Sequence, residues 1–292
     1  MAVRKFIGIT TKLTNRNEMS GFYDLSPTSP PYFCFLSIKQ LYMIISDDNE
    51  LKKMKAVSQA VAVTLLKMQQ YAKPGISTQE LDEYGGDILM EFGARSAPRL
   101  TYGFPGYTCI SLNNEVAHGI PSPGRILQDG DLINIDVSAE LDGYWSDNGG
   151  SIVVGEDLHG HSSLVDASKN ILLSAISRIK GGVRINEIGH YIETEARKRG
   201  YLVIKNLGGH GLGKALHEEP FDLLNYKDPD DKRRFRKGTV VAIETFINTH
   251  STLAIEQADG FTLLGNKGGF AVQHEHTLVV TDDKPIILTA VE

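Results

Sequence analysis

Seven acidic and histidine residues occur in strand-like or glycine-bounded sequence, where a charged side chain needs a chemical reason. They are His118, Asp136, Asp147, His210, His217, Glu244 and Glu275. A carboxylate that ends an apolar strand is costly to remove from water unless it is paired or bound to a metal ion. If the four carboxylates converge they repel one another, and a divalent cation relieves that repulsion. The pattern therefore predicts a metal centre, in which two bridged cations would use all four carboxylates.

The stretch GGHGLGKALHEEP, residues 208–220, allows a competing interpretation as a phosphate-binding loop. From Gly208 it nearly matches G-x-x-x-x-G-K, but that loop needs Ser or Thr after the lysine, and Ala215 stands there. His210 would also place a ring inside the phosphate nest. The glycines are better explained by close backbone approach around His210, which favours the wall of a metal site.

Taken singly, these residues also have simpler explanations. An aspartate at the end of a strand is commonly a turn former, as Asp136 or Asp147 could be. Glu218 and Glu219, which follow the second histidine of the stretch, could simply be exposed. The metal interpretation depends on the joint pattern, because several unusual placements occur together.

Two β-rich segments, 130–141 and 238–248, are expected to deliver two of the acids. In each, a glycine is followed by five residues and then a carboxylate, from Gly130 to Asp136 and from Gly238 to Glu244. This repeat suggests two related halves that each bring an acid from a strand to a shared place.

Helices are expected at 47–71, 77–93, 162–180 and 185–199. The second begins with Ser77-x-x-Glu80, a capping box, and the fourth ends in ARKRG, with bases in the last turn and then glycine. The strand signals lie between and after these expected helices.

The composition fits an ordinary globular enzyme. The 292 residues can bury a substantial core, and the formal net charge of −6 argues against a general nucleic-acid binder. Only two cysteines, Cys34 and Cys109, are present, so no disulfide framework is expected and a reducing compartment is favoured. No apolar run reaches the roughly 18 residues of a membrane span.

Residues 1–42 differ from the remainder of the chain. They contain SPTSPPYFCF, which has no helical period, and basic residues without acids at the start, a weak sign of a transit peptide. We interpret them as an irregular, loosely attached extension, and we expect a single catalytic domain at 43–292.

From about residue 45 to 290 the sequence resembles the type I methionine aminopeptidases, metallopeptidases of family M24 with the pita-bread fold. The resemblance rests on the blocks HGIPS, GDLINIDVSAELDGYWSD, GHGLGKALHEEP, GTVVAIET and VQHEHTLVVTDD, in family order and spacing. It implies an α/β fold of two pseudo-symmetric halves, with a curved antiparallel sheet flanked by helices.

The resemblance also implies five ligands for two divalent ions: Asp136, Asp147, His210, Glu244 and Glu275. Asp147 and Glu275 would bridge both ions, Asp136 would bind one ion, and His210 with Glu244 would bind the other. Four carboxylates and one imidazole form an oxygen-rich set that suits Mn²⁺ or Fe²⁺, with Co²⁺ and Zn²⁺ also able to bind.

The activity implied is removal of the N-terminal methionine from peptides and nascent chains, favouring a small second residue. His118 and His217 would lie beside the scissile bond, where both would bind substrate and act in catalysis. Glu244 would also carry a proton from water to the leaving amine. We expect a cytoplasmic monomer that works on nascent chains and therefore near the ribosome, without nucleic-acid or membrane partners.

The methionine pocket departs from the family pattern. Leu216 stands where a Phe is frequent, Phe261 where a Trp is frequent, and Thr245 where proline often follows the strand glutamate. The pocket residues carried over are Tyr102, Phe104, Cys109, Leu216 and Phe261. As an alternative, Cys109 could be a small buried hydrophobe.

Two other functions are compatible with this fold. A proline-specific aminopeptidase or dipeptidase carries similar ligands but usually a large N-terminal domain, for which the 42-residue extension is too short. A non-catalytic binding protein of the same fold loses ligands, whereas this sequence keeps all five.

Overall fold

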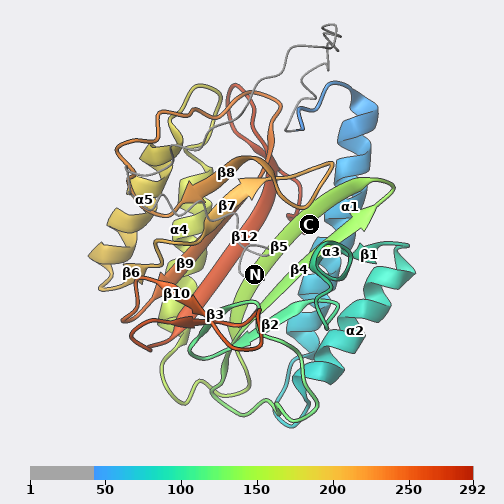
Figure 1. Ribbon diagram of the computed structural model, residues 1–292, viewed down its shortest axis with the longest axis vertical. Coiled ribbons are helices and arrows are strands. Elements are labelled where there is room, and N and C mark those ends of the chain that lie inside the picture. The colour runs from blue at the N-terminus through green and yellow to red at the C-terminus, as the bar shows by residue number, and fades with distance from the viewer. Residues whose placement is uncertain (1–42, 292) are drawn as a thin grey trace, which may run out of the picture.

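A large antiparallel sheet forms the centre of the molecule (Figure 1). The computed structural model describes residues 43–291, and the expectations for residues 1–42 lie outside them. The strands are β1 Arg95–Ser96, β2 Cys109–Leu112, β3 Glu115–Ala117, β4 Leu132–Leu141, β5 Tyr144–Val153, β6 Leu202–Val203, β7 Gly208–Gly211, β8 Glu218–Leu224, β9 Val240–Asn248, β10 Ala254–Glu256, β11 Leu263–Gly265, β12 Ala271–Val279 and β13 Ile286–Ile287.

Ten of these strands form the main sheet, whose central path runs β1-β4-β5-β12-β9-β7-β8. Beside this path, β13 pairs with β12, β2 with β4 and β6 with β9. The remaining three form a small sheet in the order β10-β11-β3. The central path joins strands from early and late in the chain at the β5–β12 boundary, so the two halves share one sheet.

Five helices accompany the sheet: α1 Asp48–Tyr71, α2 Thr78–Glu91, α3 Ala97–Tyr102, α4 Ser162–Ile176 and α5 Ile185–Lys198. The predicted capping box is present: the Ser77 side chain accepts from the Glu80 backbone, and the Glu80 side chain accepts from the Ser77 backbone. The helix expected at 162–180 ends at Ile176, because residues 177–178 form a turn instead.

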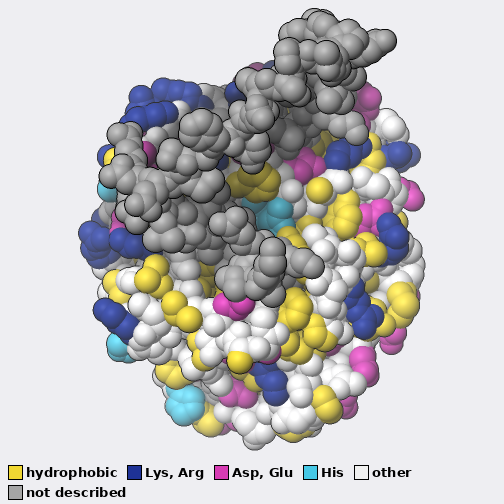
Figure 2. Space-filling view, viewed as in Figure 1, with side chains coloured by type: hydrophobic (Ala, Val, Ile, Leu, Met, Phe, Trp, Pro, Cys, Tyr) yellow, Lys and Arg dark blue, Asp and Glu magenta, His cyan; other side chains and the backbone are white. Residues whose placement is uncertain are grey.

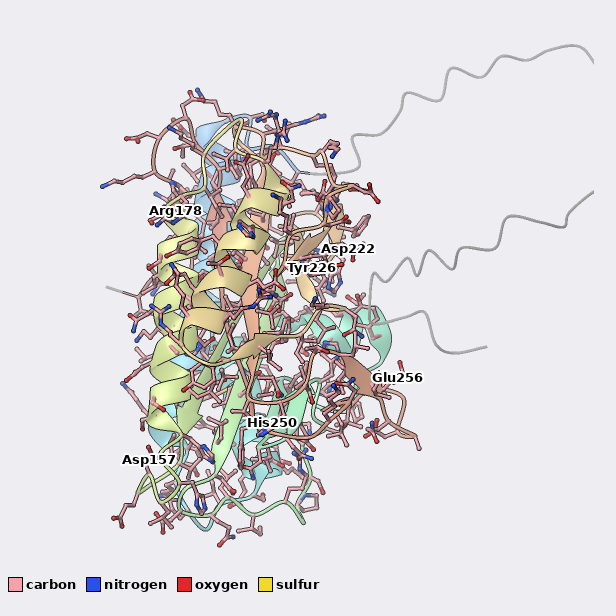
Figure 3. All side chains as sticks on the ribbon, turned by 90° about the vertical axis from the view of Figure 1, so that its left-hand side faces the viewer. Asp157, Arg178, Asp222, Tyr226, His250 and Glu256 are labelled. Atoms are coloured by element: carbon pink, nitrogen blue, oxygen red, sulfur yellow. The ribbon has the colours of Figure 1, made fainter. Side chains whose placement is uncertain are left out.

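The long helices α1 and α4 cover one face of the main sheet, as the side view shows (Figure 3). Helix α1 contacts β4 and β5, and α4 contacts β9 and β12. The small sheet, marked by Glu256, lies on the opposite side (Figure 3). The predicted layered α/β architecture is confirmed.

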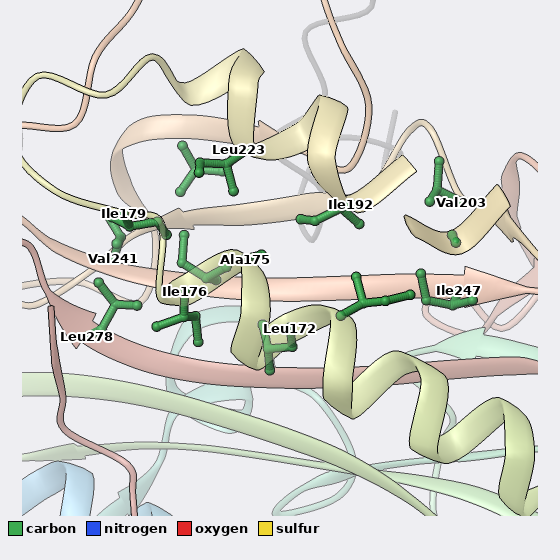
Figure 4. Close-up of a cluster of buried hydrophobic side chains, with 14 of the residues drawn as sticks. Leu172, Ala175, Ile176, Ile179, Ile192, Val203, Leu223, Val241, Ile247 and Leu278 are labelled. Carbon is green, nitrogen blue, oxygen red and sulfur yellow. The ribbon is translucent and has the colours of Figure 1, made fainter. Parts of the chain in front are cut away.

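Apolar side chains alternate along the central strands toward the helices. On β4, Ile133, Ile135 and Val137 belong to a buried cluster with residues of α1. On β9, Val241 and Ile247 belong to a second cluster with α4 and α5 (Figure 4). Because strand side chains alternate between faces, the even-numbered residues of both strands point to the face that carries no long helix.

Each half contains one long antiparallel pair at the centre of the sheet. The β4–β5 pair runs from Leu132↔Val153 to Leu141↔Tyr144, and the β9–β12 pair from Asn248↔Ala271 to Val240↔Val279. The strands predicted at 130–141 and 238–248 are β4 and β9, each starting two residues later than expected. Among the described residues, no helix has the length and apolar character that crossing a membrane requires.

Candidate active site

The five residues predicted as metal ligands lie on five different strands of the main sheet. Asp136 is on β4, Asp147 on β5, His210 on β7, Glu244 on β9 and Glu275 on β12. All five line one pocket of about 80 Å³, together with both predicted catalytic histidines. On the same face of the molecule, Figure 2 shows a histidine side chain among hydrophobic ones near the centre of the view.

Strand register explains why these side chains meet. Glu244 and Glu275 are directly opposite each other in the β9–β12 pair. Asp136 pairs with Gly149 and Asp147 with Ser138, so the two aspartates are diagonal neighbours on one face of the β4–β5 pair. Like charges placed directly opposite each other destabilise a sheet, so this arrangement requires a compensating group.

Three of the ligands are close enough to share one ion. One side-chain atom each from Asp147, His210 and Glu275 lies within 4.8 Å of the other two. Nε2 of His210 lies 3.8 Å from Oδ2 of Asp147. All three side chains are buried, which leaves little water to solvate the charges.

Burial raises the pKa of all four carboxyl groups in the pocket. The pKa of Asp136 rises to about 6, chiefly because the group loses solvation. For Asp147, loss of solvation and the charges of Glu275 and Asp136 raise the pKa well above its ordinary value. The pKa values of Glu244 and Glu275 also rise well above the ordinary value, first because both groups lose solvation and then because other carboxylates of the pocket lie nearby. A bound divalent cation reverses this situation, because it favours the ionised carboxylates.

The donor set fits a divalent ion. Oδ1 of Asp147 and Oε1 of Glu275 are buried and have no hydrogen-bond partner among the described residues. Buried polar atoms normally have a partner, and a cation between these side chains would supply one. Oxygen-rich sites with one imidazole suit hard or borderline divalent metals.

His210 presents one nitrogen to this place. Its Nδ1 lies 3.1 Å from the carbonyl oxygen of Gly211, and a carbonyl can only accept, so Nδ1 carries the proton. Burial lowers the pKa of His210 to about 4, so the ring is neutral. Nε2 therefore offers a lone pair on the side of Asp147, as a metal-ligating histidine does.

The glycines around His210 permit close approach of neighbouring strands. A Cβ on Gly209 would lie 2.2 Å from the carbonyl oxygen of Ala242, and one on Gly211 would lie 2.2 Å from that of Glu219. The stretch forms strand β7, which is followed by another strand rather than by a helix. The close backbone approach expected around His210 is confirmed, and a phosphate-binding loop before a helix is excluded.

His118 and His217 stand beside the ligands and are partly exposed in the pocket. The ring of His217 lies 4.2 Å from that of His210 between centroids. Its Nδ1 is 2.5 Å from the hydroxyl oxygen of Tyr102. Burial lowers the pKa of His118 to about 4 and the pKa of His217 well below its ordinary value. Both rings are therefore neutral and able to donate one proton and accept another.

Glu218 is buried, and the expectation that it could be exposed is wrong. Its carboxylate accepts backbone N–H groups from Met43 at 2.7 Å, Lys214 at 2.5 Å and Ala215 at 2.7 Å. Three such donors compensate the loss of water around the charge. The carboxylate thereby fixes the turn that precedes His217.

The five predicted pocket residues fall into three groups. Cys109 and Leu216 line the pocket beside the ligands. Tyr102 reaches it through its contact with His217. Phe104 and Phe261 pack edge to face, with 5.2 Å between ring centroids, and do not line this pocket.

Sequence reasoning missed several residues that line or support the site. Phe246 and Ser138 line the pocket two residues after predicted ligands on the same strands. Period-two alternation would have found both, because residues i and i+2 of a strand share a face. Gln273, two residues before Glu275, donates to two of the carboxylates. The same alternation would have placed it on the ligand face.

A buried group of carboxylates and one imidazole, built by two halves of a helix-flanked antiparallel sheet, defines a metal-dependent enzyme with a divalent-metal site. A model of the metallopeptidase family M24 matches residues 52–282. The chain belongs to the metallopeptidase family M24.

Several known proteins resemble this chain over nearly their whole length. The methionine aminopeptidase 2 of Bacillus subtilis is 46% identical over 247 residues, which cover 85% of this chain and 99% of that protein. The crystal structure of a methionine aminopeptidase from Thermotoga maritima has a TM-score of 0.81 and 31% identity, covering 85% of this chain and 100% of the other. That from Rickettsia prowazekii has a TM-score of 0.80 and 30% identity, with the same coverage.

Proposed function

We propose that this chain is a methionine aminopeptidase of type I, which removes the N-terminal methionine from peptides and nascent chains with a small second residue. The observation that carries the proposal is the single pocket that holds five metal-binding side chains and two neutral histidines. The similar proteins that bear this name support it, since they match almost end to end. Its place of action would be the cytoplasm, near the ribosome, as a monomer.

Two divalent ions would bind, with Asp147 and Glu275 between them. The partnerless buried oxygens of these two residues support this assignment. Asp136 would hold one ion, and Glu244 with Nε2 of His210 would hold the other. Mn²⁺ and Fe²⁺ suit the oxygen-rich set best, and Co²⁺ and Zn²⁺ also fit.

Divalent ions bound there supply an activated water near neutral pH and polarise a carbonyl oxygen. The residues of the chain perform the remaining tasks. A carboxylate oxygen of Glu244 takes the proton of the attacking water and passes it to the leaving amine nitrogen. Asp136 faces the free amino group of the substrate, which restricts cleavage to the first peptide bond because an internal bond has no such amine.

The two histidines stabilise groups that change during the reaction. In this proposal the Tyr102 hydroxyl, which lies 2.5 Å from Nδ1 of His217, donates to that nitrogen and leaves the imidazole proton on Nε2. Nε2 then donates to the oxyanion that develops on the substrate carbonyl. His118 holds the departing amide by a hydrogen bond. Cys109 and Leu216, which line the pocket, would form an apolar surface against the methionine side chain.

A turnover assay tests this function against its rivals. Met-Ala-Ser and an Ala-Pro peptide are offered to the protein with and without EDTA, followed by readdition of Mn²⁺. We expect cleavage of Met-Ala-Ser alone, loss of cleavage with EDTA and recovery with Mn²⁺. Cleavage of the Ala-Pro peptide would indicate a proline-specific enzyme. No cleavage of either would indicate a binding protein.

A further inference from the structure

Gln273 occupies a central position beneath the proposed metal site. It lies on β12 two residues before Glu275, so the two side chains share a sheet face. The side chain of Gln273 is 1% exposed. An amide this deeply buried needs partners for both its oxygen and its nitrogen.

The amide nitrogen of Gln273 donates to two carboxylates at once. Nε2 lies 3.0 Å from Oε2 of Glu275 and 3.3 Å from Oε2 of Glu244. Carboxylates only accept, so the nitrogen and not the oxygen of the amide must face them. One neutral side chain therefore holds one oxygen of each of two opposed glutamates.

The opposite half of the molecule fixes the orientation of this amide. Nδ2 of Asn134, on β4, lies 2.8 Å from Oε1 of Gln273 and 3.1 Å from its backbone oxygen. Ser151, on β5, donates through Oγ to the same backbone oxygen and accepts from the Gln273 backbone N–H, both at 3.0 Å. If the amide were flipped, its NH₂ group would face Nδ2 of Asn134. Two donors would then meet, and the hydrogen bond from Asn134 would be lost.

Gly149 leaves the space that the amide occupies. A Cβ at residue 149 would lie 2.1 Å from Oε1 and 2.5 Å from Nε2 of Gln273. No side chain larger than hydrogen fits there unless Gln273 moves. The amide is therefore held by hydrogen bonds from one side and enclosed by backbone from the other.

We propose that Gln273 is a positioning residue for the metal centre, which orients Glu244 and Glu275 by holding their Oε2 atoms. This leaves Oε1 of Glu275, which is buried without a partner among the described residues, directed to the cation. Asn134 acts through Gln273, because its Nδ2 donates to Gln273 and Ser151 and not to either glutamate. The inference rests on the proposed metal site and adds a pre-arranged hydrogen-bond network to it.

The alternative is that Gln273 only fills space at the boundary between the halves. The two possibilities differ in what the N–H donor does. A space-filling role needs the shape of the side chain, which methionine reproduces closely. A positioning role needs the donor, and its loss should weaken metal binding, since partners of metal ligands typically contribute about 10- to 100-fold in affinity.

The test compares four full-length proteins: wild type, Gln273→Met, Asn134→Leu and Gln79→Met. Gln79 is the matched control, because its Nε2 also donates to a carboxylate, that of Glu83 at 2.7 Å, on the surface of α2. Each protein is stripped of metal and titrated with Mn²⁺ by calorimetry. Thermal unfolding of the stripped proteins and visible absorption of the Co²⁺-loaded proteins are also measured.

We expect Gln273→Met to bind Mn²⁺ about 10- to 100-fold more weakly than wild type and to shift the Co²⁺ absorption bands. Asn134→Leu should change both in the same direction by a smaller factor, and Gln79→Met should change neither. If Gln273→Met does not fold, Asn134→Leu carries the comparison. Affinities within twofold of wild type in both variants, with only the unfolding temperature lowered, would overturn the inference. A wild-type protein that binds no divalent ion would overturn the proposed function instead.

Discussion

The two halves of the sheet use related strand pairs but deliver their acids differently. In the β4–β5 pair the carboxylates are short and diagonal, at Asp136 and Asp147. In the β9–β12 pair they are long and directly opposed, at Glu244 and Glu275. The half with the directly opposed glutamates also carries Gln273. The amide nitrogen of Gln273 donates to Oε2 of both glutamates.

The difference shows what a repeated backbone pattern leaves open. The diagonal aspartates still interact, because the charge of Asp136 helps to raise the pKa of Asp147, whereas the opposed glutamates share one amide donor. The β4–β5 half provides the amide of Asn134 and the space at Gly149 that keep Gln273 in place. The halves are therefore complementary at the site, although their cores are built alike against α1 and α4.

The largest expected effect comes from neutralising the carboxylate of Asp147 in one half or of Glu275 in the other. Asp147→Asn and Glu275→Gln should each lose bound metal and turnover together, because each residue has a buried carboxylate oxygen without a hydrogen-bond partner among the described residues. Removing a hydrogen-bond partner of a metal ligand already lowers metal affinity or activity by about 10- to 100-fold. Removing the charge of a ligand itself should therefore lower turnover by more than about 100-fold. Metal content by mass spectrometry and cleavage of Met-Ala-Ser measure both. An active variant without metal would show that the two halves do not share a centre.

Metal removal should affect stability as well as activity. The stripped protein keeps four buried carboxylates whose pKa values are raised, a cost that a cation removes. Mn²⁺ at 100 times its Kd should raise the free energy of unfolding by about 2.7 kcal/mol. Denaturant unfolding with EDTA and with Mn²⁺ measures the difference. Equal midpoints would mean that the ion binds elsewhere or that the folded state does not depend on it.

His217→Ala should separate metal binding from catalysis. The imidazole contacts Tyr102 and His210 beside the proposed ligands. We expect metal content to be unchanged and kcat to fall by about 10²- to 10³-fold, the scale for loss of an oxyanion donor. Tyr102→Phe should have a smaller effect in the same direction. Loss of metal in His217→Ala would instead make this histidine a ligand.

The smallest expected effect concerns the start of α4, in the half with the opposed glutamates. Asp157 accepts from the backbone N–H groups of His161 at 2.8 Å and Ser162 at 2.9 Å. The Ser162 hydrogen bonds are the largest cause that lowers the pKa of Asp157 to about 2. A carboxyl with a lowered folded pKa stabilises the fold above its unfolded pKa, about 3.9, and this stability is lost as pH falls toward 2.

Asp157→Asn should therefore lower the unfolding temperature slightly at pH 6, and the gap from wild type should narrow as pH falls below about 4. Thermal unfolding across pH 3–7 measures the gap. Ser163→Ala provides the control, because it removes a neutral hydrogen bond from the Ser163 hydroxyl to the carbonyl oxygen of Gly160 at the same helix start. A gap that widens in acid would mean that Asp157 stabilises the fold in its protonated form.

Much of the fold was predictable because its signals are local. Helix periodicity and the Ser77 cap placed α1 and α2 nearly to the residue, and the glycine-to-acid repeat located β4 and β9. The end of α4 was not predictable, because Ser177 keeps helical backbone angles while the chain already turns. Helix ends depend on which turn competes locally, a small energy difference that composition does not show.

The side chains at the site were predictable as residue types but not as a network. The period-two pattern of β4 and β9 could place Asp136 and Glu244 on one face of each strand, but it could not pair the strands across the molecule. Asn134 and Gln273 are 139 residues apart in sequence, and only the β5–β12 boundary brings them together. The burial of Glu218 was not predictable, because no local signal shows the three N–H groups that surround its carboxylate.

The most direct test of the shared centre is anomalous X-ray diffraction at the manganese edge from crystals of the full chain grown with Mn²⁺. The account predicts two anomalous peaks between the β4–β5 and β9–β12 pairs, with Asp147 and Glu275 contacting both. Well-ordered crystals of active protein with no anomalous peak among these side chains would contradict it.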